Sequence, residues 1–401
     1  KIFRLEQNYR STKNILDIAS HLIGHNKDRL GKKLWSEGER GDLVKLNCYK
    51  NGKEEARGVS NILEEYSKNN NSLNEAAILV RAIYQTREFE ERFLKVGINY
   101  RIIGGIKFYE RAEVKDAICY LRIINQKFDD LAFERIVNTP RRGIGDTTIK
   151  QLHEFASKNK VCLEDASRQL LQNNKFKPKI KIIFSNFLDL INKWRSDLKK
   201  NKHYDLLKIV LDESGYSAML KNKKDIENEN RLENLKELLR AMNDYDNLQG
   251  FLEHVALATS IDQEWNDEKV NIMTMHAAKG LEFNSIFLPG WEEGLFPHQK
   301  SLEEKGDLAL EEERRLAYVG VTRAKKSAYI SFATQRVWHG EWMDSLPSRF
   351  INELPDKGIE KNEELIKDVS DDFDFNQDRL LENNDEFRSP GWARLKKKLT
   401  K

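Results

Sequence analysis

The sequence predicts an α/β fold in which a parallel sheet covered by helices is interrupted by a mostly α-helical segment. Over the first hundred residues, short β-branched runs alternate with amphipathic helical patterns, and β runs return after residue 268. Between residues 113 and 267, apolar residues recur instead at helical spacing, as at Phe184, Leu188 and Ile191. The two flanking parts must therefore combine to close one sheet and one core.

Individual elements follow from these patterns. In the first part, strands are expected at Ile2–Leu5, Leu43–Cys48, Ala77–Val80 and Tyr100–Ile103. The helices between them are expected at Thr12–His25, Glu54–Ser67 and Thr86–Val96, the last ended by Gly97. After the helical segment, strands are expected at Val270–Met275, Ser285–Pro289 and Ala328–Phe332, with a helix around Glu311–Val319.

Composition excludes several classes of protein. With 401 residues the chain is long enough for two or three domains. Its 68 basic and 65 acidic residues leave a charge of only +3, so DNA binding must come from local patches. No apolar run approaches the roughly 18 residues of a membrane span. Three widely spaced cysteines without a CxxC pair indicate neither a disulfide framework nor a zinc cluster, which favours the cytoplasm.

The end of the chain has strongly segregated charge. Residues 353–387 hold 13 acidic and 4 basic side chains, and residues 388–401 hold 6 basic and no acidic ones. Such blocks are typical of solvated, flexible tails, which can bind a partner protein.

Several catalytic motifs are missing. The nearest resemblance to a phosphate-binding P-loop, from Gly24 to Lys33, has the wrong glycine spacing and no hydroxyl after its lysine. There is no G-x-S-x-G nucleophile elbow, and the His21/His25 pair lacks the glutamate of a zinc protease.

Three segments do point to chemistry, and the first is LEQNYRST at Leu5–Thr12. Its Tyr9 ring can stack on a base, and the Arg10 guanidinium can reach a phosphate. Taken alone, the pair also fits ordinary packing beside a surface charge.

The second segment, VNIMTMHAAKGLEF at Val270–Phe283, leads from a β run into a loop of small residues. Gly280 would let the backbone approach a phosphate, and Glu282 could accept a hydrogen bond from a ribose hydroxyl. A sharp turn that needs glycine for steric reasons explains the pattern about equally well.

The third segment, EEERRLAYVGVTRAKK at Glu311–Lys326, begins with three carboxylates. We expect them in the first turn of a helix, where they complement its dipole, rather than as a metal triad, and no metal site is predicted. Arg323 follows near the helix end and suits a transition-state contact.

A fourth segment lies in the helical part, where Arg141 and Arg142 precede Gly143 and Gly145. Glycines allow backbone N–H groups to approach a phosphate, and a helix N-terminus adds a favourable dipole. The alternative is a turn between two helices with exposed arginines.

Together the first three segments resemble, in order and spacing, the C-terminal motifs of superfamily 1A DNA helicases of the UvrD/PcrA/Rep type. The resemblance covers residues 1–355. It implies a RecA-like second domain, of P-loop NTPase type but without the P-loop, at 1–112 and 268–355. The inserted helical subdomain would be 113–267, followed by a tail at 356–401.

In this family ATP with Mg²⁺ lies between two RecA-like domains, the first of which carries the P-loop and the Mg²⁺-binding acids. The resemblance implies that Tyr9 stacks on adenine, that Arg10 and Arg323 contact the γ-phosphate, and that Gly280 and Glu282 line the ribose and phosphate side. The abrupt start at Lys1 is interpreted as truncation, so the fragment alone is expected to be inactive.

The resemblance also implies DNA contacts. Arg81 and His298 would contact single-stranded DNA, and His276 would link this track to the nucleotide. Either Trp338 or His339 would be the stacking platform where relatives have Phe or Tyr.

The sequence departs from the family at Ile83, where relatives commonly have Asn, so one hydrogen bond to DNA is in doubt. The segment at 141–145 resembles the family's duplex-contacting GIG element.

The expected function is therefore that of the C-terminal half of a bacterial, cytoplasmic, ATP-dependent 3′–5′ DNA helicase in repair or replication restart. Expected partners are single-stranded DNA, a duplex junction, the N-terminal RecA-like domain of the same parent and, through the tail, repair or transcription proteins, with no membrane. Two alternatives stay open, a catalytically dead DNA-binding adaptor and the motor half of a helicase-nuclease.

Overall fold

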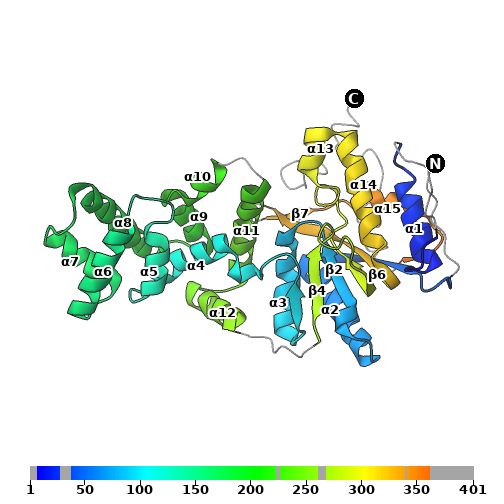
Figure 1. Ribbon diagram of the computed structural model, residues 1–401, viewed down its shortest axis with the longest axis horizontal. Helices are drawn as coiled ribbons and strands as arrows, with labels where there is room; N and C mark the ends of the chain where they lie inside the picture. Colours follow the sequence, from blue (N-terminus) through cyan, green and yellow to red (C-terminus); the bar gives the residue numbers. More distant parts are fainter. Residues whose placement is uncertain (1–6, 28–37, 223–225, 261–267, 339–340, 362–401) are drawn as a thin grey trace. The chain divides into compact units, whose positions relative to one another are not determined.

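The computed structural model describes residues 7–27, 38–222, 226–260, 268–338 and 341–361 (Figure 1). It divides into two compact units, residues 1–107 with 263–401, and residues 108–262. The strand expected at Ile2–Leu5 and the tail beyond residue 361 lie outside the described residues.

The first unit is built on one eight-stranded sheet in the order β3-β4-β2-β5-β6-β1-β8, with β7 paired to β6. Neighbours along this order are parallel, and only the β6–β7 pair is antiparallel among the described strands. The strands are β1 Val44–Asn51, β2 Ala76–Val80, β3 Tyr100–Ile102, β4 Val270–Thr274, β5 Phe283–Leu288, β6 Ala324–Trp338, β7 Glu341–Asp344 and β8 Ile359–Lys361.

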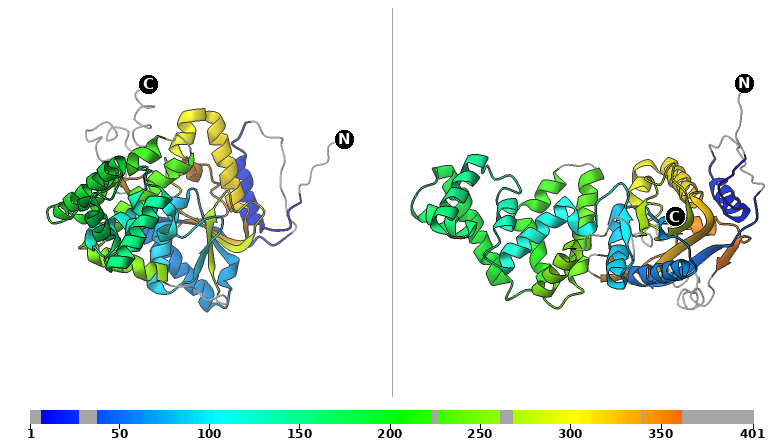
Figure 2. Two further views of the ribbon diagram at one scale, coloured as in Figure 1. Left: turned by 60° about the vertical axis from the view of Figure 1, so that its left-hand side comes forward. Right: turned by 60° about the horizontal axis from the view of Figure 1, so that its bottom comes forward.

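Helices cover both faces of this sheet (Figure 2). The helices of this unit are α1 Lys13–Ile23, α2 Gly52–Lys68, α3 Thr86–Val96, α13 Gln299–Lys305, α14 Asp307–Val321 and α15 Arg349–Asn352. Of these, α13 packs on α14. In β2 all five residues are buried: Ala77 and Leu79 pack in the core that includes α1 and α14, and Ile78 and Val80 in the core that includes α2 and α3. A strand covered on both faces is therefore a continuous apolar run.

Local signals set the helix boundaries near the sheet. Asn51 caps α2 by accepting a hydrogen bond from the Glu54 backbone N–H at 3.0 Å. Gly97 ends α3 in the left-handed region, at φ 75°, which glycine adopts without a Cβ penalty. The boundaries Thr86–Val96 predicted for this helix are confirmed.

The second unit is helical. Its helices are α4 Ala112–Asn125, α5 Asp130–Val137, α6 Asp146–Asn159, α7 Leu163–Gln172, α8 Pro178–Asp197, α9 His203–Glu213, α10 Tyr216–Lys221, α11 Ile226–Met242 and α12 Leu248–Ser260. Helix α4 packs against α5, α8, α9, α11 and α12. In the core of this unit, the rings of Tyr120 on α4 and Trp194 on α8 pack edge to face, with 5.8 Å between their centroids.

The structure confirms the predicted fold class and corrects two boundaries. Helix α14 begins at Asp307 and not at Glu311, because Gly306, at φ 55°, separates it from α13 and Asp307 supplies the acidic first turn. Strand β6 extends to Trp338, well beyond Phe332, because its second half pairs with β7.

Among the described residues, no helix has the length and apolar character to cross a membrane.

Candidate nucleotide and DNA site

The predicted nucleotide contacts lie together at the amino ends of β5 and β6. Glu282 immediately precedes β5, and Arg323 immediately precedes β6, its parallel neighbour. The segment that carries Arg10 is tied to the same end of β6, where the Ser11 hydroxyl donates to the Ala324 carbonyl at 2.6 Å. Three distant parts of the sequence therefore meet at one edge of the sheet.

The charges at this edge are mostly positive. The Arg10 guanidinium donates to Glu282 at 2.7 Å, the Lys325 ammonium lies 3.0 Å from the other Glu282 oxygen, and together they lower the pKa of Glu282. Arg323 donates to the Val319 carbonyl at 3.0 Å, and its pKa is lowered by burial and by the charge of Arg10. Three cations around one carboxylate suit a polyanion such as a triphosphate.

Two further predicted residues border this cluster. Tyr9 is 84% exposed, so its ring is free to stack, although its hydroxyl donates to Gln7 at 2.6 Å. Gly280 has a φ of 90°, and a Cβ built on it would meet nothing within 4 Å. Backbone conformation, rather than crowding by neighbouring atoms, therefore requires a glycine there in this structure.

The predicted DNA contacts lie at the opposite edge of the sheet. After these predictions, the edge at the carboxyl ends of the strands is called the DNA edge, and the edge at their amino ends is called the nucleotide edge. Arg81 directly follows β2, His276 lies two residues after β4, and His298 ends the loop that follows β5. Because these strands are parallel, their carboxyl ends share an edge, about 17 Å from the amino ends in a six-residue strand. Partial burial and the charge of Arg81 lower the pKa of His276.

One residue that the sequence analysis did not assign to this edge is Glu313. Its carboxylate receives the Arg81 guanidinium at 2.6 Å and the His298 backbone N–H at 3.1 Å. The spacing of Glu313 with Leu316, Ala317 and Gly320 on one side of the helix could have revealed its inward position. The expectation that Glu311–Glu313 lie in the first turn was wrong, because α14 begins four residues earlier.

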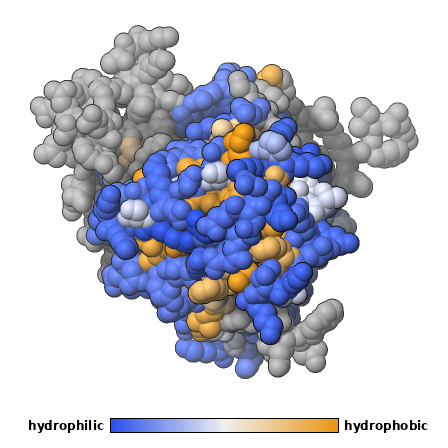
Figure 3. All heavy atoms as spheres, turned by 90° about the vertical axis from the view of Figure 1, so that its left-hand side faces the viewer, coloured by the Kyte–Doolittle hydropathy of each residue, from blue (hydrophilic) through white to orange (hydrophobic). Residues whose placement is uncertain are grey.

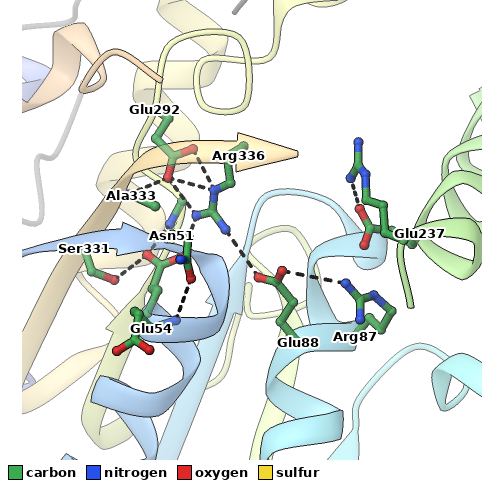
Figure 4. A network of polar contacts seen from close by, with 12 residues as sticks. Asn51, Glu54, Arg87, Glu88, Glu237, Glu292, Ser331, Ala333 and Arg336 are labelled. Carbon is green, nitrogen blue, oxygen red and sulfur yellow. Dashed lines mark hydrogen bonds and ion pairs between the residues drawn. The ribbon is translucent and has the colours of Figure 1, made fainter. Parts of the chain in front are cut away.

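A buried ionic network holds the loop after β5 (Figure 4). The Arg336 guanidinium of β6 donates to Glu55 at 2.6 Å and to Glu292 at 2.7 Å, and lies 3.5 Å from Glu88. Burial would lower the pKa of Arg336, but Glu292 and Glu55 raise it well above its usual range. The sequence analysis did not find this network, since its members come from four separate elements.

The network also binds the backbone of that loop. Glu55 accepts from the Gly290 N–H at 3.0 Å, and Glu292 accepts from the Ala333 N–H at 2.7 Å. The loop that leads to His298 is therefore fastened to α2 and β6 before it reaches the DNA edge.

The candidate stacking platform lies at the β6–β7 hairpin. Trp338 is the last residue of β6, and His339 lies outside the described residues, so the choice between the two stays a prediction. On the partner strand β7, Trp342 is 51% exposed, an aromatic that the sequence analysis did not single out.

The GIG segment joins α5 to α6 in the helical unit. Gly143 has a φ of 89°, Gly145 caps α6, and Arg141 is exposed. The Arg142 guanidinium instead donates to the Ile136 carbonyl at 2.8 Å and lies 4.7 Å from the Phe187 ring centre. Arg142 thus holds the loop from inside, while Arg141 faces solvent.

The face of the molecule that Figure 3 shows is largely hydrophilic, with groups of hydrophobic residues exposed between hydrophilic ones. Exposed apolar residues of the helical unit include Phe128, Leu131 and Ile182. Scattered residues of this kind are ordinary on soluble proteins. Within the described part of the chain, no group of three or more His, Cys, Asp or Glu side chains is arranged to hold a metal.

Comparison with known proteins agrees with this arrangement. Residues 3–335 match the UvrD-like helicase C-terminal domain. The chain is 43% identical over 359 residues to a probable DNA helicase II homolog of Rickettsia conorii, covering 89% of this chain and 55% of that protein. It is 43% identical to DNA helicase II of Escherichia coli and 37% identical to the ATP-dependent DNA helicase PcrA of Staphylococcus epidermidis, covering 89% of this chain and 51% and 50% of those proteins.

The chain thus spans about half the length of the curated relatives it matches. The match extends over the helical unit, strands β1 to β5 and most of β6, and it includes Arg10, Arg81, Glu282 and Arg323. This protein chain belongs to the UvrD-like helicase C-terminal domain family.

Proposed function

We propose that this chain acts as the C-terminal half of an ATP-dependent 3′–5′ DNA helicase and translocase that unwinds duplex DNA in repair or replication restart, in the cytoplasm. The observation that carries the proposal is the separation of two clusters on one sheet. Arg10, Glu282 and Arg323 gather at the amino ends of the strands, and Arg81, His276 and His298 follow the carboxyl ends. Such a sheet can contact a nucleotide at one edge and DNA at the other.

At the nucleotide edge, the cationic cluster fits the phosphates of ATP. Arg10 and Arg323 would stabilise the charge that develops during hydrolysis, Tyr9 would stack on adenine, and Gly280 and Glu282 would contact the phosphate and ribose side. The P-loop and the Mg²⁺-binding acids would come from the N-terminal RecA-like domain of the parent protein. The chain alone should therefore not hydrolyse ATP.

At the DNA edge, Arg81, His276 and His298 would contact the strand, and the ring of Trp338, His339 or Trp342 would stack on a base. In the helical unit, Arg141, Gly143 and Gly145 would contact the duplex backbone, with Arg142 holding that loop in shape.

We assign the second RecA-like domain to 1–112 and 268–355, the inserted subdomain to 113–267 and a partner-binding tail to 356–401. Repair or transcription proteins are the partners proposed for the tail.

The polarity of unwinding tests this proposal. The chain is mixed with a separately produced N-terminal half that carries the P-loop, and strand displacement is measured on duplexes with a 3′ or a 5′ single-stranded tail. ATP-dependent displacement only with the 3′ tail is expected. Displacement only with the 5′ tail would contradict the polarity, and DNA binding without any displacement would favour a DNA-binding adaptor.

A further inference from the structure

Glu313 is a buried carboxylate at the centre of the DNA edge. It is 4% exposed and lies on the side of α14 that also buries Ala309, Leu316 and Ala317. A charged group in this position is costly unless its oxygens are paired. Its neighbour Glu312 instead points outward, with a side chain 71% exposed and paired with Arg315.

Four hydrogen bonds satisfy the Glu313 carboxylate, the longest of them donated by Arg81 Nε to Oε1 at 3.2 Å. Arg81 donates from Nε at 2.8 Å to Oε2 and from Nη2 at 2.6 Å to Oε1, and the His298 backbone N–H donates at 3.1 Å to Oε2. The bidentate pair fixes the plane of the guanidinium as well as its position. Glu313 thereby joins the residue after β2, the loop after β5 and helix α14.

This arrangement uses two of the three guanidinium nitrogens of Arg81. For Nη1, the described residues provide no hydrogen-bond acceptor, and the Arg81 side chain is 16% exposed. An arginine held by its Nε and Nη2 edge presents Nη1 in one direction, which lowers the entropy lost when a phosphate binds.

We propose that Glu313 is a positioning residue for single-stranded DNA, which orients Arg81 toward the phosphate backbone and fastens the His298 segment beside it. The inference rests on the proposed function, because it assumes that this edge binds DNA. It adds a role for a carboxylate, a group that repels DNA when it acts through its charge alone.

That repulsion makes the test decisive, since the two roles predict effects of opposite sign. Replacing Glu313 with Gln removes a negative charge near the DNA. If Glu313 acts only through its charge, it repels DNA, and the Gln variant should bind DNA more tightly. A positioning residue gives the reverse, because the Gln side chain keeps an acceptor for the His298 N–H but loses the bidentate ion pair with Arg81.

The experiment measures fluorescence anisotropy of a labelled oligothymidylate titrated with this chain. Glu313→Gln is expected to weaken binding roughly tenfold, which corresponds to the lower end of the contribution of one hydrogen bond to a charged group. Glu312→Gln removes the same charge from the next residue and should leave the affinity unchanged or slightly tighter. Equal or tighter binding by Glu313→Gln would overturn the inference.

Two further variants separate positioning from loss of structure. Glu313→Asp keeps the charge but shortens the side chain by one methylene, and it should also weaken binding. In an Arg81→Met background, Glu313→Gln should have no further effect; an undiminished effect there would show that Glu313 does not act through Arg81. If the unaltered chain binds no oligothymidylate, the proposed function fails, which is distinct from normal binding that ignores Glu313.

Discussion

Single residues at the nucleotide edge owe their places to contacts with the ends of strands. Arg10 reaches Glu282, 272 residues away in the sequence, at 2.7 Å, and Arg323 is held through backbone carbonyls rather than through a carboxylate. Within the described residues, Arg10 is ion-paired and Arg323 is not, which leaves positive charge available to a ligand.

Gly280 gives a prediction at this scale. Gly280→Ala should lower the free energy of unfolding by about 1–2 kcal/mol, because an L-residue is strained at φ 90° even where there is space. Gly250→Ala, on helix α12 with only an ordinary contact at 3.7 Å, should instead stabilise by about 0.5–1 kcal/mol. Urea unfolding of both variants measures the contrast, and a neutral Gly280→Ala would show that φ is not what requires glycine.

Among the helices, α14 connects residues at both edges of the sheet. Glu313 contacts Arg81 at the DNA edge, and Arg323 follows two residues after the last residue of the helix, at the nucleotide edge. From Glu313 to Val321 the helix advances eight residues, which span about 12 Å. A shift of α14 would therefore move contacts at both edges together.

Strand β6 also joins separate elements of the sheet unit, through Arg336. Arg336 joins β6 to Glu55 of α2 and to Glu292 in the loop after β5. Both carboxylates are about 1% exposed, and the Arg336 guanidinium is a cation that both of them contact.

Removing that guanidinium should be costly. Arg336→Met should lower the free energy of unfolding by about 3–5 kcal/mol, because it leaves two buried carboxylates without their cation. Arg315→Met breaks an exposed pair on α14 and should cost less than about 1 kcal/mol. Denaturant unfolding compares the two, and an Arg336→Met loss as small as that of Arg315→Met would contradict the importance of the network.

At the scale of the whole molecule, sequence patterns predicted the fold class but not all of its boundaries. β2 and α3 could be predicted because an apolar run and a glycine stop are local signals. The start of α14 could not, since Asp307 and Glu311 are equally plausible acidic first residues, and the long β6 depends on pairing with β7.

The residues of the candidate site likewise divide into those that the sequence predicted and those that it did not. The motifs identified Arg10, Arg81, Glu282 and Arg323, and their roles remain proposals. Glu313 and the Arg336 network were missed, because buried ion pairs between distant elements leave little local pattern in a sequence. The different surroundings of Arg141 and Arg142 likewise depend on Phe187 and Tyr120, which lie outside the motif.

The most direct test of the account is DNA-stimulated ATP hydrolysis. It is measured for the chain alone and for its mixture with a P-loop-bearing N-terminal half, with Arg323→Ala compared against Arg315→Ala, an exposed arginine of α14. We predict no activity alone, activity in the mixture that Arg315→Ala retains, and a loss of about 1,000-fold or more with Arg323→Ala. Hydrolysis by the chain alone, or an Arg323→Ala mixture as active as the unaltered one, would contradict it.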